Sequence, residues 1–81
     1  MVQVVIWGSL RSATDGEASV EVDATNFKDV LIQLAQNYPG LKPQIDSGVS
    51  LAIDGRIYRE AWFTPVRPDS EVILMPLMVG G

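Results

Sequence analysis

A chain of 81 residues is long enough for one small domain, and its 47% hydrophobic and 20% charged residues are typical of a folded globular protein. It contains no cysteine and no histidine, which excludes disulfides, thiolate nucleophiles and histidine-based proton or metal chemistry. Ten acidic residues against six basic ones argue against nucleic-acid binding. No stretch has the length and flanks of a signal peptide or a membrane span, so we expect a cytoplasmic protein that acts without a membrane.

Two strands joined by a long loop are predicted at the N-terminus. Residues 2–7 are apolar on both faces, which is typical of a central strand. Val5 and Trp7 share one of these faces, and Trp7 is alternatively a surface residue that a partner uses. Residues 8–17 are rich in loop residues. Residues 18–23 then alternate between apolar and polar, so we predict a half-exposed strand that pairs antiparallel with the first.

A helix is predicted over residues 27–37. Asn26 is a good N-cap, and Asp29, three residues later, places a carboxylate in the first turn. The apolar residues that recur at helical spacing are Phe27, Val30, Leu31, Leu34, Ala35 and Tyr38. They form one stripe, which must pack against a sheet. The Pro39-Gly40 pair ends the helix, because the residue before a proline is driven out of the helical region and glycine permits a turn.

A second pair of strands follows the helix. Residues 41–48 are predicted to be a loop, and residues 49–53 alternate as a strand. The pair Asp54-Gly55 is the strongest tight-turn signal in the chain, so residues 56–58 are predicted to return as a short edge strand. Residues 59–69 contain two prolines, which exclude a central strand there.

The last predicted strand covers residues 71–75, and Pro76 removes a backbone donor where its ladder should stop. Because the first and last strands are the most apolar, we place them side by side and parallel in the centre of a mixed sheet. The predicted fold is therefore α+β, a β-grasp arrangement of four to five strands with one main helix across one face. It occupies residues 1–75 and precedes a flexible tail over residues 76–81.

The tail carries the main functional hypothesis. Residues 77–79 are apolar, and Gly80 and Gly81 have no side chain. Fully extended, the tail reaches roughly 20 Å, so a bare carboxylate on Gly81 can enter a narrow active site of a partner enzyme. A frayed terminus or a remnant of cloning is the alternative, but three apolar residues without a partner would lower solubility. The predicted partner-binding residues are Trp7, Pro76, Leu77, Met78 and Val79, with Val5 as an alternative to Trp7. Gly80 is predicted to thread the channel.

In these features the chain resembles the ThiS and MoaD family of ubiquitin-like sulfur carriers, small proteins that end in Gly-Gly. The resemblance spans nearly the whole chain. It rests on Leu10-Arg11, Val20-Glu21-Val22, Tyr38-Pro39-Gly40-Leu41, Ile53-Asp54-Gly55, Ser70-Glu71-Val72 and Gly80-Gly81, in that order. The length and the Leu-Arg pair are most similar to MoaD, the small subunit of molybdopterin synthase.

The resemblance implies a cosubstrate with no catalytic residue and no bound cofactor or metal. An E1-like adenylating enzyme would use ATP and Mg²⁺ to activate Gly81, and sulfur transfer would leave a thiocarboxylate. That sulfur would then be delivered inside an acceptor synthase, either MoaE-like or of another kind. The acceptor stays open: a molybdopterin precursor, a thiazole, an amino acid or a specialised metabolite.

Two other functions are retained as alternatives. In the first, the chain is a ubiquitin-like modifier whose activated Gly81 is captured by a lysine amine of another protein. In the second, it is a β-grasp binding module that does not need its glycines. Arg56, Arg59 and Arg67 are candidates for a basic edge that binds an acidic partner, but solvated surface charge is the preferred interpretation.

Overall fold

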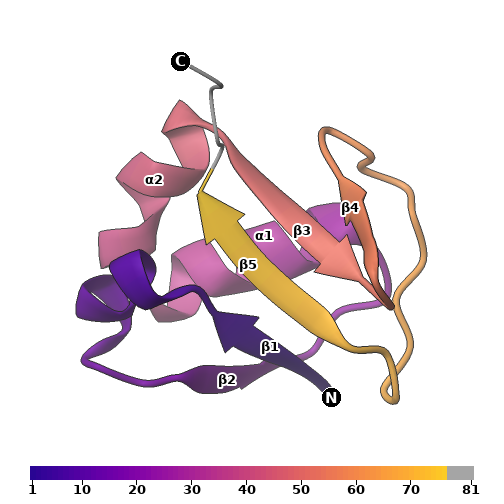
Figure 1. Ribbon diagram of the computed structural model, residues 1–81, viewed down its shortest axis with the longest axis horizontal. Helices are drawn as coiled ribbons and strands as arrows, with labels where there is room; N and C mark the ends of the chain where they lie inside the picture. The colour runs from indigo at the N-terminus through magenta and orange to yellow at the C-terminus, as the bar shows by residue number, and fades with distance from the viewer. Residues whose placement is uncertain (77–81) are drawn as a thin grey trace.

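A mixed sheet forms the centre of the computed structural model, which describes residues 1–76. Within these residues the five strands are β1 (Val2–Ile6), β2 (Ser19–Val22), β3 (Val49–Ile53), β4 (Arg56–Tyr58) and β5 (Val72–Pro76). Their order across the sheet is β2-β1-β5-β3-β4 (Figure 1). The strands β1 and β5 are parallel and every other neighbouring pair is antiparallel, so the predicted central pairing is confirmed.

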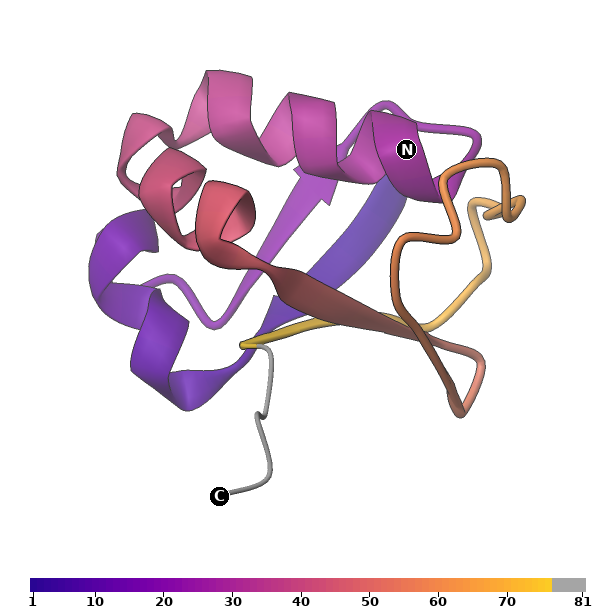
Figure 2. The same cartoon turned by 90° about the horizontal axis from the view of Figure 1, so that it is seen from above.

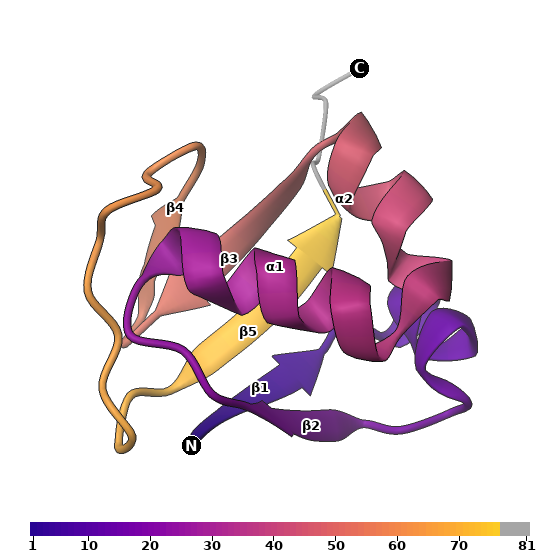
Figure 3. The same cartoon turned by 180° about the vertical axis from the view of Figure 1, so that it is seen from behind.

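One main helix, α1 (Phe27–Asn37), crosses one face of the sheet as predicted (Figure 3). The backbone N–H of Asp29 donates to Oδ1 of Asn26 at 2.8 Å, which confirms the N-cap. The buried residues of α1 are Phe27, Val30, Leu31 and Leu34. They lie on the predicted stripe, so the period of the apolar residues correctly identified the face that packs on the sheet.

The loops predicted over residues 8–17 and 41–48 are partly helical. A 3-10 helix, η1 (Gly8–Thr14), follows β1, and a second, η2 (Pro39–Leu41), leads into the short helix α2 (Lys42–Ser47). In η1 the side chain of Thr14 is fully buried. Its hydroxyl donates a hydrogen bond shared between the backbone carbonyls of Arg11, at 3.1 Å, and Glu17, at 2.9 Å. Such short helices bury few side chains, so the sequence shows no apolar stripe at these positions.

The core lies between the sheet and α1 (Figure 2). Along β1 the burial alternates strictly, with Val2, Val4 and Ile6 inside and the residues between them exposed. In β5, Val72 and Leu74 are fully buried and face the helix, whereas Ile73 and Met75 are half-buried. Because successive side chains in a strand point to opposite faces, the second face of the sheet carries its own set of residues. No described helix covers that face.

The strand β5 runs one residue further than predicted. Pro76 pairs with Val49 of β3 and is the last residue of β5. A proline at the final position of a strand ends the ladder without interrupting it, since its missing N–H affects only the last pair. The structure thus fixes the point at which the chain leaves the sheet.

Candidate functional site

A row of apolar residues crosses the uncovered face of the sheet. Val5 of β1 lies opposite Ile73 of β5, Ile73 lies opposite Ala52 of β3, and Ala52 lies opposite Ile57 of β4. Val5 is 38% exposed and Ile57 is 67% exposed, whereas Ala52 is nearly buried between them. Four strands therefore contribute to one continuous apolar strip, and a strip of this kind on a protein surface is typical of an interaction site.

A second row lies beside the first, towards the end where the chain leaves the sheet. Met75 of β5 is opposite Ser50 of β3. On the other side, the backbone N–H of Trp7 donates to the carbonyl of Leu74 at 3.0 Å, which extends the β1–β5 ladder by one residue and places Trp7 next to Met75. The side chain of Trp7 is 46% exposed. The two rows also contain Ala52 and Ser50, which are buried. We give the name open-face patch to the apolar residues of the two rows that are exposed or half-buried: Val5, Trp7, Ile57, Ile73 and Met75.

The predicted partner-binding residues are only partly within the described chain. Trp7 belongs to the open-face patch, and Pro76 lies at the same end of the sheet, so the structure brings these two together. Leu77, Met78, Val79, Gly80 and Gly81 lie outside the described residues, and the roles assigned to them stay predictions. What the structure does establish is that β5 ends at Pro76, beside Trp7 and Met75, so the undescribed residues continue from that end of the sheet.

Three members of the open-face patch were not predicted as site residues. Ile57, Ile73 and Met75 were assigned to strands, but their common face becomes visible only with the strand order and register. The available signal was the unbroken apolar run of β5, because residues that alternate with the core residues Val72 and Leu74 must point to the other face of the sheet. A strand with apolar residues on both faces has either two cores or one core and one binding surface.

The three arginines do not form one basic site. Arg56 and Arg67 line a hollow of about 470 Å³, and that hollow is also lined by Asp54 and Asp69. Arg59 is not part of it. Two bases beside two acids give a locally balanced charge, which agrees better with solvated surface charge than with a dedicated site for an acidic partner.

Two further observations concern residues 1–76 alone. Among them, no group of three or more carboxylates is arranged so as to hold a metal ion. None of the helices in this part of the chain has the length and apolar character needed to cross a membrane.

A five-stranded sheet with one crossing helix, and with its first and last strands parallel at the centre, defines the ubiquitin-like β-grasp class. The ThiS family model matches residues 4–81, and the chain belongs to the ThiS family. The predicted fold and the predicted family are therefore both confirmed. A search of curated proteins returns no significant match.

Several solved structures agree with the β-grasp fold of this chain. A chain in the crystal structure of the Amycolatopsis orientalis BexX/CysO complex matches with a TM-score of 0.79 at 19% identity, and each chain is covered to 100%. Mycobacterium tuberculosis CysO matches with a TM-score of 0.79 at 21% identity, over 96% of this chain and 100% of that one. SAMP1 from Haloferax volcanii has a TM-score of 0.78 at 20% identity, over 99% and 98%. At these identities the likeness shows a shared fold.

Proposed function

We propose that this chain is a sulfur carrier, and that an E1-like enzyme adenylates Gly81 before a thiocarboxylate forms there. The observation that carries the proposal is the exit of the chain at Pro76, beside an uncovered apolar sheet face, in a member of the ThiS family. One partner surface can hold the open-face patch and receive residues 77–81 at the same time. The proposal requires that Gly81 carries the free carboxylate, which the intact mass of the protein from its native source tests directly.

The chemistry follows from the weakness of a carboxylate as an electrophile. The Gly81 carboxylate attacks the α-phosphate of ATP, releases pyrophosphate and forms an acyl-adenylate. A hydrosulfide-type nucleophile then attacks the acyl carbon, AMP leaves, and a thiocarboxylate remains. In this proposal the partner supplies ATP, Mg²⁺ and every catalytic group. This chain contributes binding energy from its apolar residues, which positions the one reacting carbon.

The recipient in this proposal is a synthase that uses the thiocarboxylate sulfur as a nucleophile. A MoaE-like molybdopterin synthase subunit is the recipient that the Leu10-Arg11 pair favours, and an enzyme that builds another sulfur-containing metabolite is the alternative. A protein partner is supported by the matching chain in the BexX/CysO complex. Because the patch is apolar at its centre, the recipient should present an apolar surface around the mouth of a narrow channel.

A second candidate function is conjugation to lysine. It is favoured by one specific comparison, the solution structure of small archaeal modifier protein 1 from Methanosarcina acetivorans, which matches with a TM-score of 0.77 at 24% identity. Activation of Gly81 would be identical in that case. The two functions differ only in the nucleophile that displaces AMP, since a lysine amine gives an isopeptide bond and a sulfur nucleophile gives a thiocarboxylate.

The test uses the full chain with ATP, Mg²⁺, the activating enzyme and a sulfur source. The intact mass should rise by the difference between sulfur and oxygen. A control with one residue added after Gly81 moves the carboxylate beyond the adenylation site and should keep its mass and its melting temperature. If the extended chain gained sulfur without first being trimmed to Gly81, the carrier mechanism would be wrong. Isopeptide conjugates in cells, without a thiocarboxylate on the free protein, would instead establish the modifier.

A further inference from the structure

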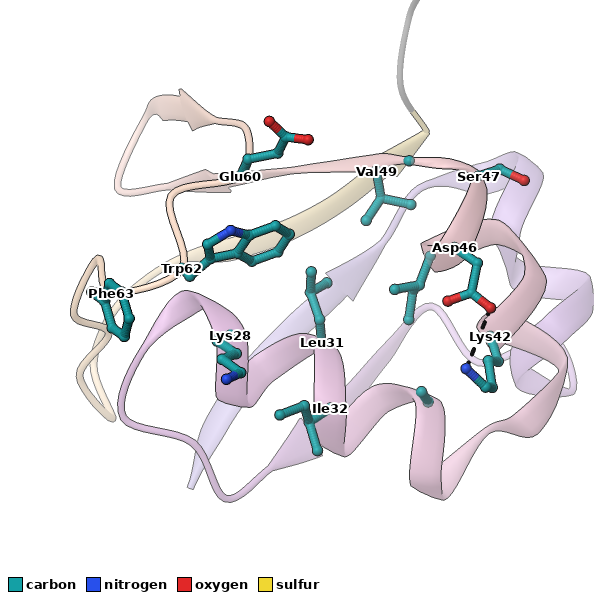
Figure 4. A pocket seen from close by; sticks show the side chains of 13 residues that line it. Lys28, Leu31, Ile32, Lys42, Asp46, Ser47, Val49, Glu60, Trp62 and Phe63 are labelled. Carbon is teal, nitrogen blue, oxygen red and sulfur yellow. Dashed lines mark hydrogen bonds and ion pairs between the residues drawn. The ribbon is translucent and has the colours of Figure 1, made fainter.

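A groove of about 680 Å³ lies on the helical side of the molecule, on the other side of the sheet from the open-face patch (Figure 4). It runs between α1, α2, the start of β3 and the loop that follows β4. The larger apolar residues that line it are Leu31, Ile32, Ile45, Val49, Trp62 and Phe63. We name it the helix-side groove. The proposed sulfur-carrier function does not account for it.

Three large apolar side chains of the groove are exposed to solvent. Ile32 is 40% exposed, Trp62 is 43% exposed and Phe63 is 84% exposed. Trp62 is nevertheless held in place, because its ring packs edge-to-face on Phe27 with 5.6 Å between the ring centroids. Its carbonyl also accepts a hydrogen bond from the backbone N–H of Lys28 at 3.0 Å. The groove is therefore largely preformed, which lowers the entropy lost when a ligand binds.

One cation in the groove is available to a ligand. Lys42 is paired with Asp46 at 3.3 Å, so their charges cancel. Lys28 lies towards the end marked by Trp62 and Phe63, and it makes no ion pair with any residue among 1–76 (Figure 4). Glu60 lines the groove from the loop after β4 and would direct an anion towards α1. The charges of Lys28, Lys42, Asp46 and Glu60 therefore balance overall, but Lys28 and Glu60 come from different walls of the groove. Within residues 1–76 the groove combines an apolar wall with one ammonium group that has no ion-pair partner.

This combination is the complement of an apolar segment that ends in a carboxylate. Under the proposed function the chain itself supplies such a segment, Leu77, Met78, Val79, Gly80 and Gly81. We propose that the helix-side groove binds residues 77–81 of a second copy, with the apolar side chains on Ile32 and Trp62 and the carboxylate at Lys28. The carboxylate is the one part of this inference that rests on the proposed function. Extended, the segment spans about 17 Å.

A second copy fits better than the same copy. The segment follows Pro76, which pairs with Val49 from the β5 side, so β3 lies between Pro76 and the groove. A neighbouring molecule has no such barrier. Because each copy offers one segment and one groove, the contact is head-to-tail. At high concentration it withholds Gly81 from the activating enzyme.

The experiment follows the indole N–H signals of the two tryptophans by NMR in the full-length protein at low concentration. The probe is the synthetic peptide Leu-Met-Val-Gly-Gly with a free carboxylate. The Trp62 signal should move and saturate, whereas the Trp7 signal on the opposite face should not. The C-terminal amide of the same peptide should bind about two- to five-fold more weakly, as expected for the loss of one exposed ion pair. In Lys28→Gln the acid and the amide should bind equally.

A matched pair of variants tests the location. Ile32→Glu should weaken peptide binding at least about five-fold, because it places a charge on the apolar wall. Ile57→Glu makes the same change on the open face and should leave peptide binding unchanged. If Ile32→Glu melts at a lower temperature than the wild type, Phe63→Ala replaces it, since a side chain that is 84% exposed contributes little to folding.

Three results would overturn the proposal. In the first, the peptide would shift the indole signal of Trp7 and not that of Trp62. In the second, the wild type would bind the acid and the amide of the peptide equally. In the third, the Trp62 signal of the full chain would already lie at its bound position and would not change on dilution. The last result would show that the segment occupies the groove of its own chain. Because no ATP or activating enzyme is present, these failures are distinct from a failure to form the thiocarboxylate.

Discussion

Ile57→Glu is the sharpest test of the open-face patch. In the free protein this side chain is 67% exposed on the short edge strand β4, so the substitution should change the free energy of unfolding by less than about 0.5 kcal/mol. Complete burial of an isoleucine contributes about 1.5–3 kcal/mol, and the two-thirds that a partner still has to cover is therefore about 1–2 kcal/mol. The loss of this burial free energy, about 1–2 kcal/mol, should weaken binding to the activating enzyme about 5- to 30-fold. Burial of the glutamate charge should weaken binding to the enzyme further.

Titration calorimetry of full-length protein with the activating enzyme measures this change. Ile32→Glu is the control, because it places the same charge on the helical side, away from the face where the enzyme is expected to bind. Thermal melting of both variants separates folding from binding. Equal weakening by the two variants would show a non-specific effect of charge. Unchanged binding of Ile57→Glu would show that the enzyme does not cover the open-face patch, and the proposed partner surface would be wrong.

Three further outcomes are expected. Leu34→Ala removes a fully buried side chain of α1 and should lower the free energy of unfolding, measured in urea, by about 2–5 kcal/mol. A loss below about 1 kcal/mol is typical of a surface substitution and would contradict the packing of α1 on the sheet. Asn26→Ala removes the acceptor of the Asp29 N–H and should cost about 0.5–2 kcal/mol in the same assay, whereas Asn26→Ser should restore most of it. Gly80→Val should melt like the wild type but form no thiocarboxylate by intact mass, because a β-branched side chain obstructs a narrow channel; normal loading would refute the threading role.

The fold was largely predictable because its main elements have strong periodic signals. The stripe of α1 and the alternation of β2 identify their buried faces without any knowledge of neighbours, whereas β3 is buried at every position although its sequence alternates. The turn at Asp54-Gly55 is equally local: Asp54 has a φ of 51° and Gly55 a φ of 85°, and aspartate and glycine are among the residues that adopt this region most easily. The short helix α2 was missed because it has six residues and none is fully buried.

The candidate site was less predictable because it depends on which strands are neighbours. Val5 and Ile57 are 52 positions apart, and only the order β1-β5-β3-β4 joins them into one strip. Trp62 and Phe63 were treated as part of a proline-rich connection, and the contact of Trp62 with the first turn of α1 is a tertiary effect. The chemistry assigned to Gly81 depends on a partner, so no local pattern in this chain can specify the acceptor.

The parallel pairing of β1 with β5 has a practical consequence for labelling. Since the two strands run in the same direction, Trp7 and Pro76 lie at one end of the sheet and Met1 at the other (Figure 1). The strand β1 has five residues, which separates these ends by roughly 15 Å, and Met1 is 64% exposed. A fluorophore, an affinity tag or a surface anchor joined at Met1 will therefore be attached at the end of the sheet opposite the point where the chain leaves β5. Immobilised in this way, the protein can be screened against cell extracts with its carboxyl end unaltered.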